Sequence, residues 1–281
     1  MRIICWGTRG SAPVCGPEFI KYGGETSCLE VRDSESGQRL IIDSGTGIRK
    51  LGDLFIREEV PETDLLFTHF HWDHIMGLPL FRPLFSEAFR INLYGHPGVY
   101  GNTFKLVFKN IFRPPHFPVR VTKLAAGIEY REVQSRFDIG GFHLEAIPLS
   151  HPDRGLGYKI SLQNKTLVFL TDNELGHRHR GGKSFKDYVR FAAGADLLIH
   201  DSEYLPEEYT EKVKWGHSTY LQAMELAFEA GISRVGFYHH NQYRTDRDMD
   251  LLVEEARLTA KNRFPALHCF AVEQGREIEL G

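Results

Sequence analysis

The chain has 281 residues, of which 42% are hydrophobic, so it is long enough for one large domain or two small ones with a sizeable core. Its formal net charge of −3 excludes the strongly basic surface typical of proteins that bind duplex nucleic acid, although it leaves room for a local basic patch. Because no apolar run approaches the length of a membrane-spanning helix, and the first residues lack the pattern of a secretory signal peptide, we expect a cytoplasmic protein without membrane contacts.

In the first part of the chain, short apolar runs alternate with glycine-rich turns. The runs at 3–6, 27–32 and 40–42 predict three strands. The third strand ends in the turn 43–47, whose glycines indicate either a close approach of the backbone to a neighbour or unusual dihedral angles. Asp43 in this turn is either a turn-forming aspartate or, as we favour, a group that orients a metal-bound histidine.

Three imidazoles and one carboxylate follow the apolar run 65–67, which predicts a buried strand. Residues 75–80 leave no room for more strand, so these four side chains are expected on a tight loop at its carboxyl end. They are His69, His71, Asp73 and His74. Imidazole and carboxylate are the ligands of a divalent cation such as zinc. One ion cannot use all four from a single direction, so we expect two ions, one facing the first pair and one facing the second.

The rest of the chain alternates predicted strands and helices. Strands are predicted at 90–94, 141–149, 158–162, 166–170, 195–199, 234–238 and 267–272. The strands 158–162 and 166–170 form an expected hairpin. Helices are predicted between Thr219 and Gly231 and over 246–263. The segment around 99–120 carries many aromatic and basic residues and three prolines, which indicates a lid or an insertion.

Five of the predicted strands end in a residue that could bind a metal. These residues are His69, His151, Asp172, Asp201 and His239. Sites in layered α/β proteins collect at the carboxyl ends of strands. Histidines packed in a core or aspartates in turns could explain single cases, but not five at the same place on their strands. We therefore expect these side chains to converge on one site.

The segment 176–186 is basic and rich in glycine. It has two interpretations, which the sequence does not separate. It is either a solvated loop without a specific role or a site for phosphate groups of a substrate.

These motifs, in this order, resemble those of the metallo-β-lactamase-fold hydrolases, most closely the ribonuclease Z-like phosphodiesterase branch. The HxHxDH signature at 69–74 is specific for that superfamily, and the segment His217-Ser218-Thr219 is what points to phosphodiesters. Further similar segments are 7–11, 26–27, 42–47, 150–158, 171–172, 198–202 and 235–239. The resemblance implies an α/β fold, with a single domain over 1–281 built as a four-layer αββα sandwich. Two facing mixed sheets would carry helices on their outer faces.

The resemblance also implies two divalent metal ions, with zinc expected first and manganese or iron as alternatives. His69, His71 and His151 would hold the first ion. Asp73, His74 and His239 would hold the second, and Asp172 would bridge the two. His239 is preferred to its neighbour His240 because it shares one face of its strand with Val235 and Phe237.

The family's chemistry would be hydrolysis of a phosphodiester by a water molecule shared between the two ions. His217, held by Asp201 at the start of a helix, is the expected general acid or oxyanion stabiliser. The corresponding motif of the family typically carries glutamate where this chain has Asp201. With Asp73, these two residues make up the predicted catalytic set.

The expected substrate is a cyclic nucleotide, a short single-stranded oligonucleotide or another small phosphodiester, not duplex nucleic acid. Enzymes of the family that mature tRNA carry a long arm between the residues matching His151 and Asp172, where this chain has little more than a hairpin. An RNA-processing endonuclease is therefore a second alternative, after a hydrolase of a carbon ester, thioester or lactone on the same fold. A redox di-iron protein and a non-catalytic RNA-binding protein are further alternatives, and a homodimer is an open one.

Overall fold

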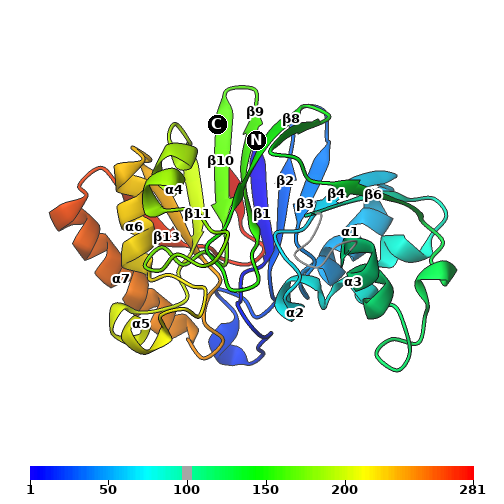
Figure 1. Cartoon of the computed structure of the whole chain (residues 1–281), viewed down its shortest axis with the longest axis horizontal. Helices are drawn as coiled ribbons and strands as arrows, with labels where there is room; N and C mark the ends of the chain where they lie inside the picture. Colours follow the sequence, from blue (N-terminus) through cyan, green and yellow to red (C-terminus); the bar gives the residue numbers. More distant parts are fainter. Residues whose placement is uncertain (97–102) are drawn as a thin grey trace.

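Two seven-stranded sheets face each other in the centre of the molecule, and helices cover their outer faces (Figure 1). The structure is a computed structural model that describes residues 1–96 and 103–281. Three apolar clusters fill the spaces between the layers: one between the sheets and one between each sheet and its helices. This arrangement confirms the predicted αββα sandwich.

The first sheet has the strand order β14-β1-β2-β3-β4-β5-β6. Its strands are β1 (Arg2–Gly7), β2 (Cys28–Arg32), β3 (Arg39–Ile42), β4 (Glu62–Leu66), β5 (Arg90–Gly95), β6 (Gly127–Glu132) and β14 (Glu277–Glu279). Strands β3 to β6 run parallel, whereas β14, β1, β2 and β3 pair antiparallel. The sheet is therefore mixed, as predicted.

The second sheet has the order β13-β12-β11-β10-β9-β8-β7. Its strands are β7 (Arg136–Ile139), β8 (Phe142–Pro148), β9 (Leu156–Leu162), β10 (Lys165–Leu170), β11 (Leu197–Asp201), β12 (Arg234–Tyr238) and β13 (His268–Ala271). Strands β10 to β13 are parallel neighbours, so their carboxyl ends meet at one edge of the sheet. This edge forms one side of the site described below.

The α-helices are α1 (Ile48–Glu58), α2 (Trp72–Ile75), α3 (Thr103–Ile111), α4 (Phe185–Ala192), α5 (Pro206–Lys212), α6 (Tyr220–Glu229) and α7 (Asp246–Arg263). Apolar side chains of α1 and α3 pack on the first sheet, and those of α4, α6 and α7 on the second. Within the described ranges, no helix combines the length and apolar character needed to cross a bilayer.

Alternation along the central strands explains why each sheet is covered on both faces. In β3, Leu40 and Ile42 point to the core between the sheets, while Ile41 points to the core under α1. In β11, Leu198 faces the helices and its neighbours Leu197 and Ile199 face the other sheet. Because successive side chains of a strand point to opposite faces, continuous apolar runs of this kind are buried on both sides.

Several sequence predictions are confirmed, and one is wrong in a way that concerns the site. Helices α6 and α7 and the hairpin β9–β10 form where they were expected. Asp73 and His74, however, lie in the short helix α2 and not on a loop. The helix begins after His71, and an aspartate in its first turn interacts favourably with the helix dipole.

The predicted lid falls partly outside the described residues, because 99–102 lie there. In its remainder, α3 buries Phe104 and Phe108 in the apolar cluster under the first sheet. Phe104 stacks on Phe70 with 5.7 Å between the ring centroids. Phe70 separates His69 from His71 in the sequence, so this segment supports the loop that carries both histidines.

The turn after β3 lies against the backbone of residues 73–77, in and just after α2. The amide of Ser44 donates to the carbonyl of His74, and that of Gly77 donates to the carbonyl of Ser44. A Cβ atom added at Gly45 would lie 2.3 Å from the carbonyl oxygen of Asp73. The glycines of this turn were expected to allow a close approach, and at Gly45 that expectation is confirmed.

We therefore expect Gly45→Ala to destabilise the fold. The added methyl has no space, and overpacking of this kind costs about 1–3 kcal/mol. A lower thermal unfolding midpoint, measured by circular dichroism, is the expected result. Gly127→Ala is the matched control, because a Cβ at Gly127 would meet nothing closer than 3.7 Å. An unchanged midpoint for Gly45→Ala would show that the turn can move away.

Candidate metal centre

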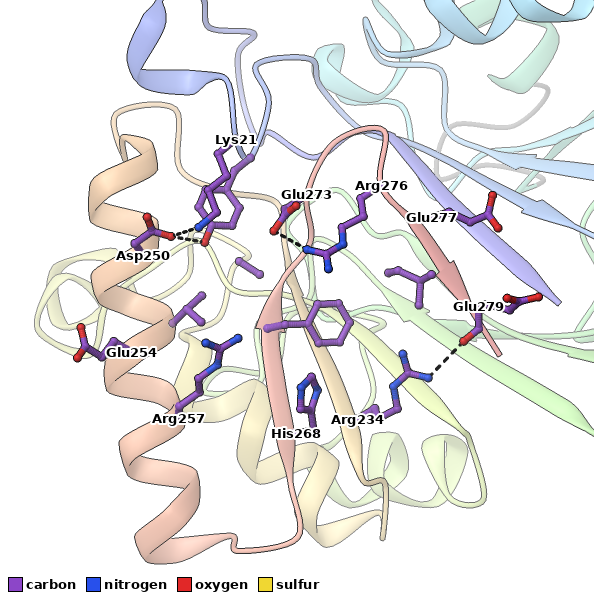
Figure 2. Close-up of a pocket in the computed structure, with 15 residues that line it drawn as sticks. Lys21, Arg234, Asp250, Glu254, Arg257, His268, Glu273, Arg276, Glu277 and Glu279 are labelled. Carbon is purple, nitrogen blue, oxygen red and sulfur yellow. Dashed lines mark hydrogen bonds and ion pairs between the residues drawn. The ribbon is translucent and has the colours of Figure 1, made fainter. Parts of the chain in front are cut away.

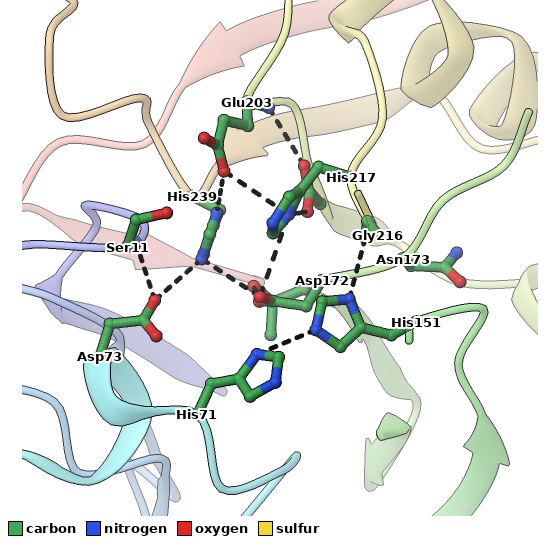
Figure 3. A network of polar contacts seen from close by, with 12 residues as sticks. Ser11, His71, Asp73, His151, Asp172, Asn173, Glu203, Gly216, His217 and His239 are labelled. Carbon is green, nitrogen blue, oxygen red and sulfur yellow. Dashed lines mark hydrogen bonds and ion pairs between the residues drawn. The ribbon is translucent and has the colours of Figure 1, made fainter. Parts of the chain in front are cut away.

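The five strand ends converge as the sequence predicts, and nine polar side chains come together there. Figure 3 shows part of this set, including His71, Asp73, His151, Asp172, His217 and His239. His69 follows β4, His151 follows β8, Asp172 follows β10, and His239 follows β12, while Asp201 is the last residue of β11. Asp172 and His239 have φ angles of 53° and 59°. This left-handed backbone is uncommon outside glycine, and it turns the chain sharply where each strand ends.

One group of potential ligands consists of His69, His71, His151 and Asp172, whose ligand atoms all lie within 4.8 Å of one another. His151 Nε2 lies 3.0 Å from His71 Nδ1, and His69 Nε2 lies 3.7 Å from Asp172 Oδ1. His69, His151 and Asp172 are buried. These four are the ligands predicted for the first ion, including the bridge.

The second group consists of Asp73, His74, Asp172 and His239, and all four are buried. His74 Nε2 lies 3.2 Å from Asp172 Oδ2, and His239 Nε2 lies 3.3 Å from Asp172 Oδ1. Asp172 therefore belongs to both groups, as expected for a bridging carboxylate. His240 faces elsewhere, with its Nε2 2.8 Å from the carbonyl oxygen of Val272.

The other nitrogen of each histidine is fixed by a partner outside the groups. The pairs are His69 with Thr68, His71 with Asp153, His74 with Asp43, His151 with the carbonyl of Gly216, and His239 with Glu203. The pair of His74 Nδ1 and Asp43 Oδ2 is the shortest, at 2.7 Å. Such partners set the orientation and tautomer of a metal-binding imidazole. Asp43 contacts His74 in the way that the favoured interpretation of the sequence predicts for a group that orients a ligand.

The residues fit a divalent cation. The Nε2 atom of His69 is buried and has no hydrogen-bond partner among the described residues. A buried polar atom without a partner is costly, so this nitrogen is suited to a ligand that the protein itself does not supply. Imidazole nitrogens and carboxylate oxygens are a donor set that suits zinc and related ions.

The charges around the second group favour positive charge. Burial lowers the pKa of His74, but the carboxylates of Asp172, Asp73 and Asp43 outweigh burial and raise it well above its usual value. The pKa of His239 is raised in the same way, against burial, chiefly by Asp172. In the first group, burial lowers the pKa of His151 to about 3, so this ligand is neutral.

His217 lies beside the second group and just before α6. Its Nδ1 is 2.6 Å from Asp201 Oδ2 and 3.5 Å from Glu203 Oε2, and its ring stacks on that of His239. Burial would lower its pKa, but Glu203 and Asp201 raise it to about 9. His217 Nε2 makes no hydrogen bond to any described residue. The raised pKa favours the protonated ring in the metal-free chain, where Nε2 is free to donate.

Sequence reasoning missed two functional groups at this site, one side chain and one backbone amide. Glu203 is buried and holds His239 Nδ1 at 3.0 Å. The signal was its spacing from Asp201, because residues two apart at a strand end point to the same side. The backbone amide of Ser11, which lies 2.9 Å from Asp73 Oδ2, carries no side-chain signal at all.

Comparisons with known proteins agree with this geometry. Residues 38–240 match the family described as the beta-lactamase superfamily domain. A ribonuclease Z of Picrophilus torridus is 26% identical over 305 residues, which covers 91% of this chain and 90% of that protein. Unliganded yeast PDE1 (15% identity, 99% of each chain) and the human short-form tRNase Z (17%, 100% of each) superpose with TM-scores of 0.73 and 0.66.

Because Asp172 belongs to both groups, Asp172→Ala should reduce bound metal more than a change in either group alone. Elemental analysis of the purified protein measures this. His71→Ala, which affects only the first group, is the comparison, and Asp138→Ala, at an exposed site, is the control. Full metal content in Asp172→Ala would show that Asp172 is not a shared ligand.

Metal binding should weaken as the pH falls. The raised pKa values of His74 and His239 mean that the metal-free chain holds protons there, and a cation must displace them. The apparent affinity should rise with pH below those pKa values, by about tenfold per unit for each proton released. Competition with a chelator at pH 6, 7 and 8 measures this, and an affinity independent of pH would contradict it.

Proposed function

Because the chain belongs to the β-lactamase superfamily, we propose that it is a metal-dependent hydrolase that cleaves a phosphodiester bond. The observation that carries the proposal is His217, held by Asp201 beside two groups of metal ligands. An alkoxide leaves phosphorus poorly without a proton, and His217 can supply one. The relatives named ribonuclease Z and the yeast PDE1 structure support the same class of reaction.

The first group would hold one divalent ion and the second group another, with Asp172 shared between them. When bound, such ions activate water and neutralise charge on phosphate oxygens. Zinc is the preferred ion because the donors are imidazole nitrogens and carboxylate oxygens, and manganese and iron are the alternatives. His239, and not His240, is the proposed last ligand.

The chain's own residues move the protons. Asp73 Oδ2 is held by the Ser11 amide, while Oδ1 makes no hydrogen bond to a described residue and can accept one from the attacking water. The water oxygen bonds to phosphorus as the bond to the leaving oxygen breaks, and its proton passes to Asp73 Oδ1. His217 Nε2 gives its proton to the leaving oxygen, and Asp201 stabilises the imidazolium until then.

The proposed substrate is a small phosphodiester or a short single strand. The connection from His151 to Asp172 is essentially the hairpin β9–β10, so the described chain has no long arm there to grip a folded tRNA. An RNA-processing endonuclease is the second candidate, favoured by the names of the relatives. Hydrolysis of a thioester or lactone on the same fold would not need His217 as a proton donor.

The test is His217→Ala in the metal-loaded protein, with ApA and bis(p-nitrophenyl) phosphate as substrates. We expect the metal content to stay, and turnover of ApA to fall by about 10²–10⁴-fold, since general acid catalysis contributes that much. The loss on bis(p-nitrophenyl) phosphate should be smaller, because nitrophenolate leaves readily without a proton.

His143→Ala, which removes an exposed histidine paired with Asp138, is the control and should match the wild type. Equal losses on both substrates would remove His217 from the role of general acid. Faster hydrolysis of a thioester than of either phosphodiester would instead support the other class of hydrolase.

A further inference from the structure

The basic loop, which we define as residues 176–186, carries four exposed cationic side chains. These are Arg178, Arg180, Lys183 and Lys186. The loop contains no aspartate or glutamate, and none of the four forms an ion pair with another described residue. The chain as a whole has a net charge of −3, so this is a local concentration of positive charge. Unpaired cations of this density attract anions.

The loop is attached directly to a metal ligand. Ser150 Oγ donates to the carbonyl of His177 at 2.6 Å and accepts from the amide of His179 at 2.9 Å. A Cβ at Gly182 would lie 2.7 Å from Ser150 Cα, so the two backbones are in contact. Ser150 precedes His151 in the sequence. The basic loop therefore lies beside the first group of ligands.

A buried carboxylate, Glu174, ties the loop to a second segment at the site. Its donors are His179 Nε2, Tyr209 Oη and the amides of Lys214 and Gly216, all within 2.7–2.8 Å. Burial opposes ionisation, but these donors lower the pKa of Glu174. Between the two amides lies Trp215, which is 58% exposed. The Lys212 ammonium lies 4.0 Å from the centroid of the Trp215 ring and covers one face, so the other face is the one left for a base. Trp215 directly precedes Gly216, whose carbonyl holds His151.

Arg154 completes the cluster. Its Nε would lie 3.3 Å from a Cβ at Gly181, so its side chain lies against the basic loop. It follows His151 by three residues and forms no ion pair with a described residue. The acidic neighbour is Asp153, which is engaged with His71 Nε2 at 3.0 Å. Arg154 therefore adds a further cationic side chain to those of the basic loop, on the side of the ligand His151.

We infer that Arg154 and the basic loop form a phosphate-binding subsite for a second phosphate of a short single-stranded oligonucleotide, with Trp215 stacking on one of its bases. The inference rests on the proposed function, because it places the scissile phosphate at the metal groups. A cationic track with exposed aromatic side chains is the recognised way to bind a single strand without reading its sequence. It also gives the basic loop the second of the two roles that its sequence allows.

A cavity elsewhere on the molecule has no comparable excess of positive charge. This cavity, of about 690 Å³, lies between α7 and the strands β13 and β14 (Figure 2). Four lysine or arginine and five aspartate or glutamate side chains line it, so its charges nearly cancel. It offers a control, because Arg257 lines it and Lys261 lies one turn further along α7.

The experiment compares kcat/KM for ApA, ApApA and pApA in the metal-loaded protein. ApApA adds an internal phosphate and pApA a terminal one, so the two arms distinguish the sources of the second phosphate. In the wild type, at least one of them should exceed ApA by roughly tenfold, and Arg180→Gln/Lys183→Gln should abolish that advantage. Removing two contacts should also lower the slope of log affinity against log salt by about 1.4. Arg154→Gln should act in the same direction, and Arg257→Gln/Lys261→Gln should keep the wild-type ratio.

Equal kcat/KM for the three substrates in the wild type would overturn the subsite and leave the hydrolase assignment intact. A loss in the double variant that is as large for ApA as for ApApA and pApA would also overturn it, since the loop would then act through His151. If none of the three is hydrolysed, the proposed function fails. Binding of fluorescein-labelled ApApA, measured by anisotropy, then decides the subsite: weakening of about tenfold in the double variant and in Trp215→Ala supports it, and no change overturns it.

Discussion

The site depends on one buried carboxylate, that of Asp172, which lies between two groups of imidazoles. Burial alone would favour its neutral form, but His239 and His74 outweigh burial and lower its pKa well below its usual value. The negative charge is therefore retained inside the protein, where it needs positive partners at short range. The two sheets supply these partners from opposite sides, since His69 and His74 lie in the segment after β4 of the first sheet, and His151 and His239 follow strands of the second. The packing of the two sheets therefore also brings the charged groups of the site together.

The ligand set was predictable from the sequence because strand ends have a simple rule. Apolar runs identify the strands, and polar residues at their carboxyl ends meet when the strands are neighbours, as for Asp172, Asp201 and His239. A close approach at Gly45 was one of the two roles predicted for the glycines of its turn, because a residue without a Cβ lets another backbone come near. Helix α1 was missed although its buried residues have helical spacing, and the edge strands β7 and β14 are too short to give a pattern. Glu203 and Glu174 were missed because what defines them is a set of contacts with segments distant in sequence.

The partners around the ligands connect the site to the rest of the fold. His71, His74, His151 and His239 are each held from behind by a group on a different element, whereas His69 is held by its neighbour Thr68. His151 is a clear case, because the carbonyl that holds it belongs to the segment fixed by Glu174. The same carboxylate also holds the basic loop. Orientation of a ligand and placement of the cationic surface therefore share a support.

The left-handed backbone at Asp43, Asp172 and His239 has a consequence for how this activity could be lost over evolution. At each position glycine would relieve the local strain. At Asp172, however, glycine would also leave His74 and His239 buried without the carboxylate that raises their pKa values, and removing one partner of a buried pair is strongly destabilising. Loss of hydrolysis would therefore not by itself release this strand end, because the metal-free fold needs the same charge.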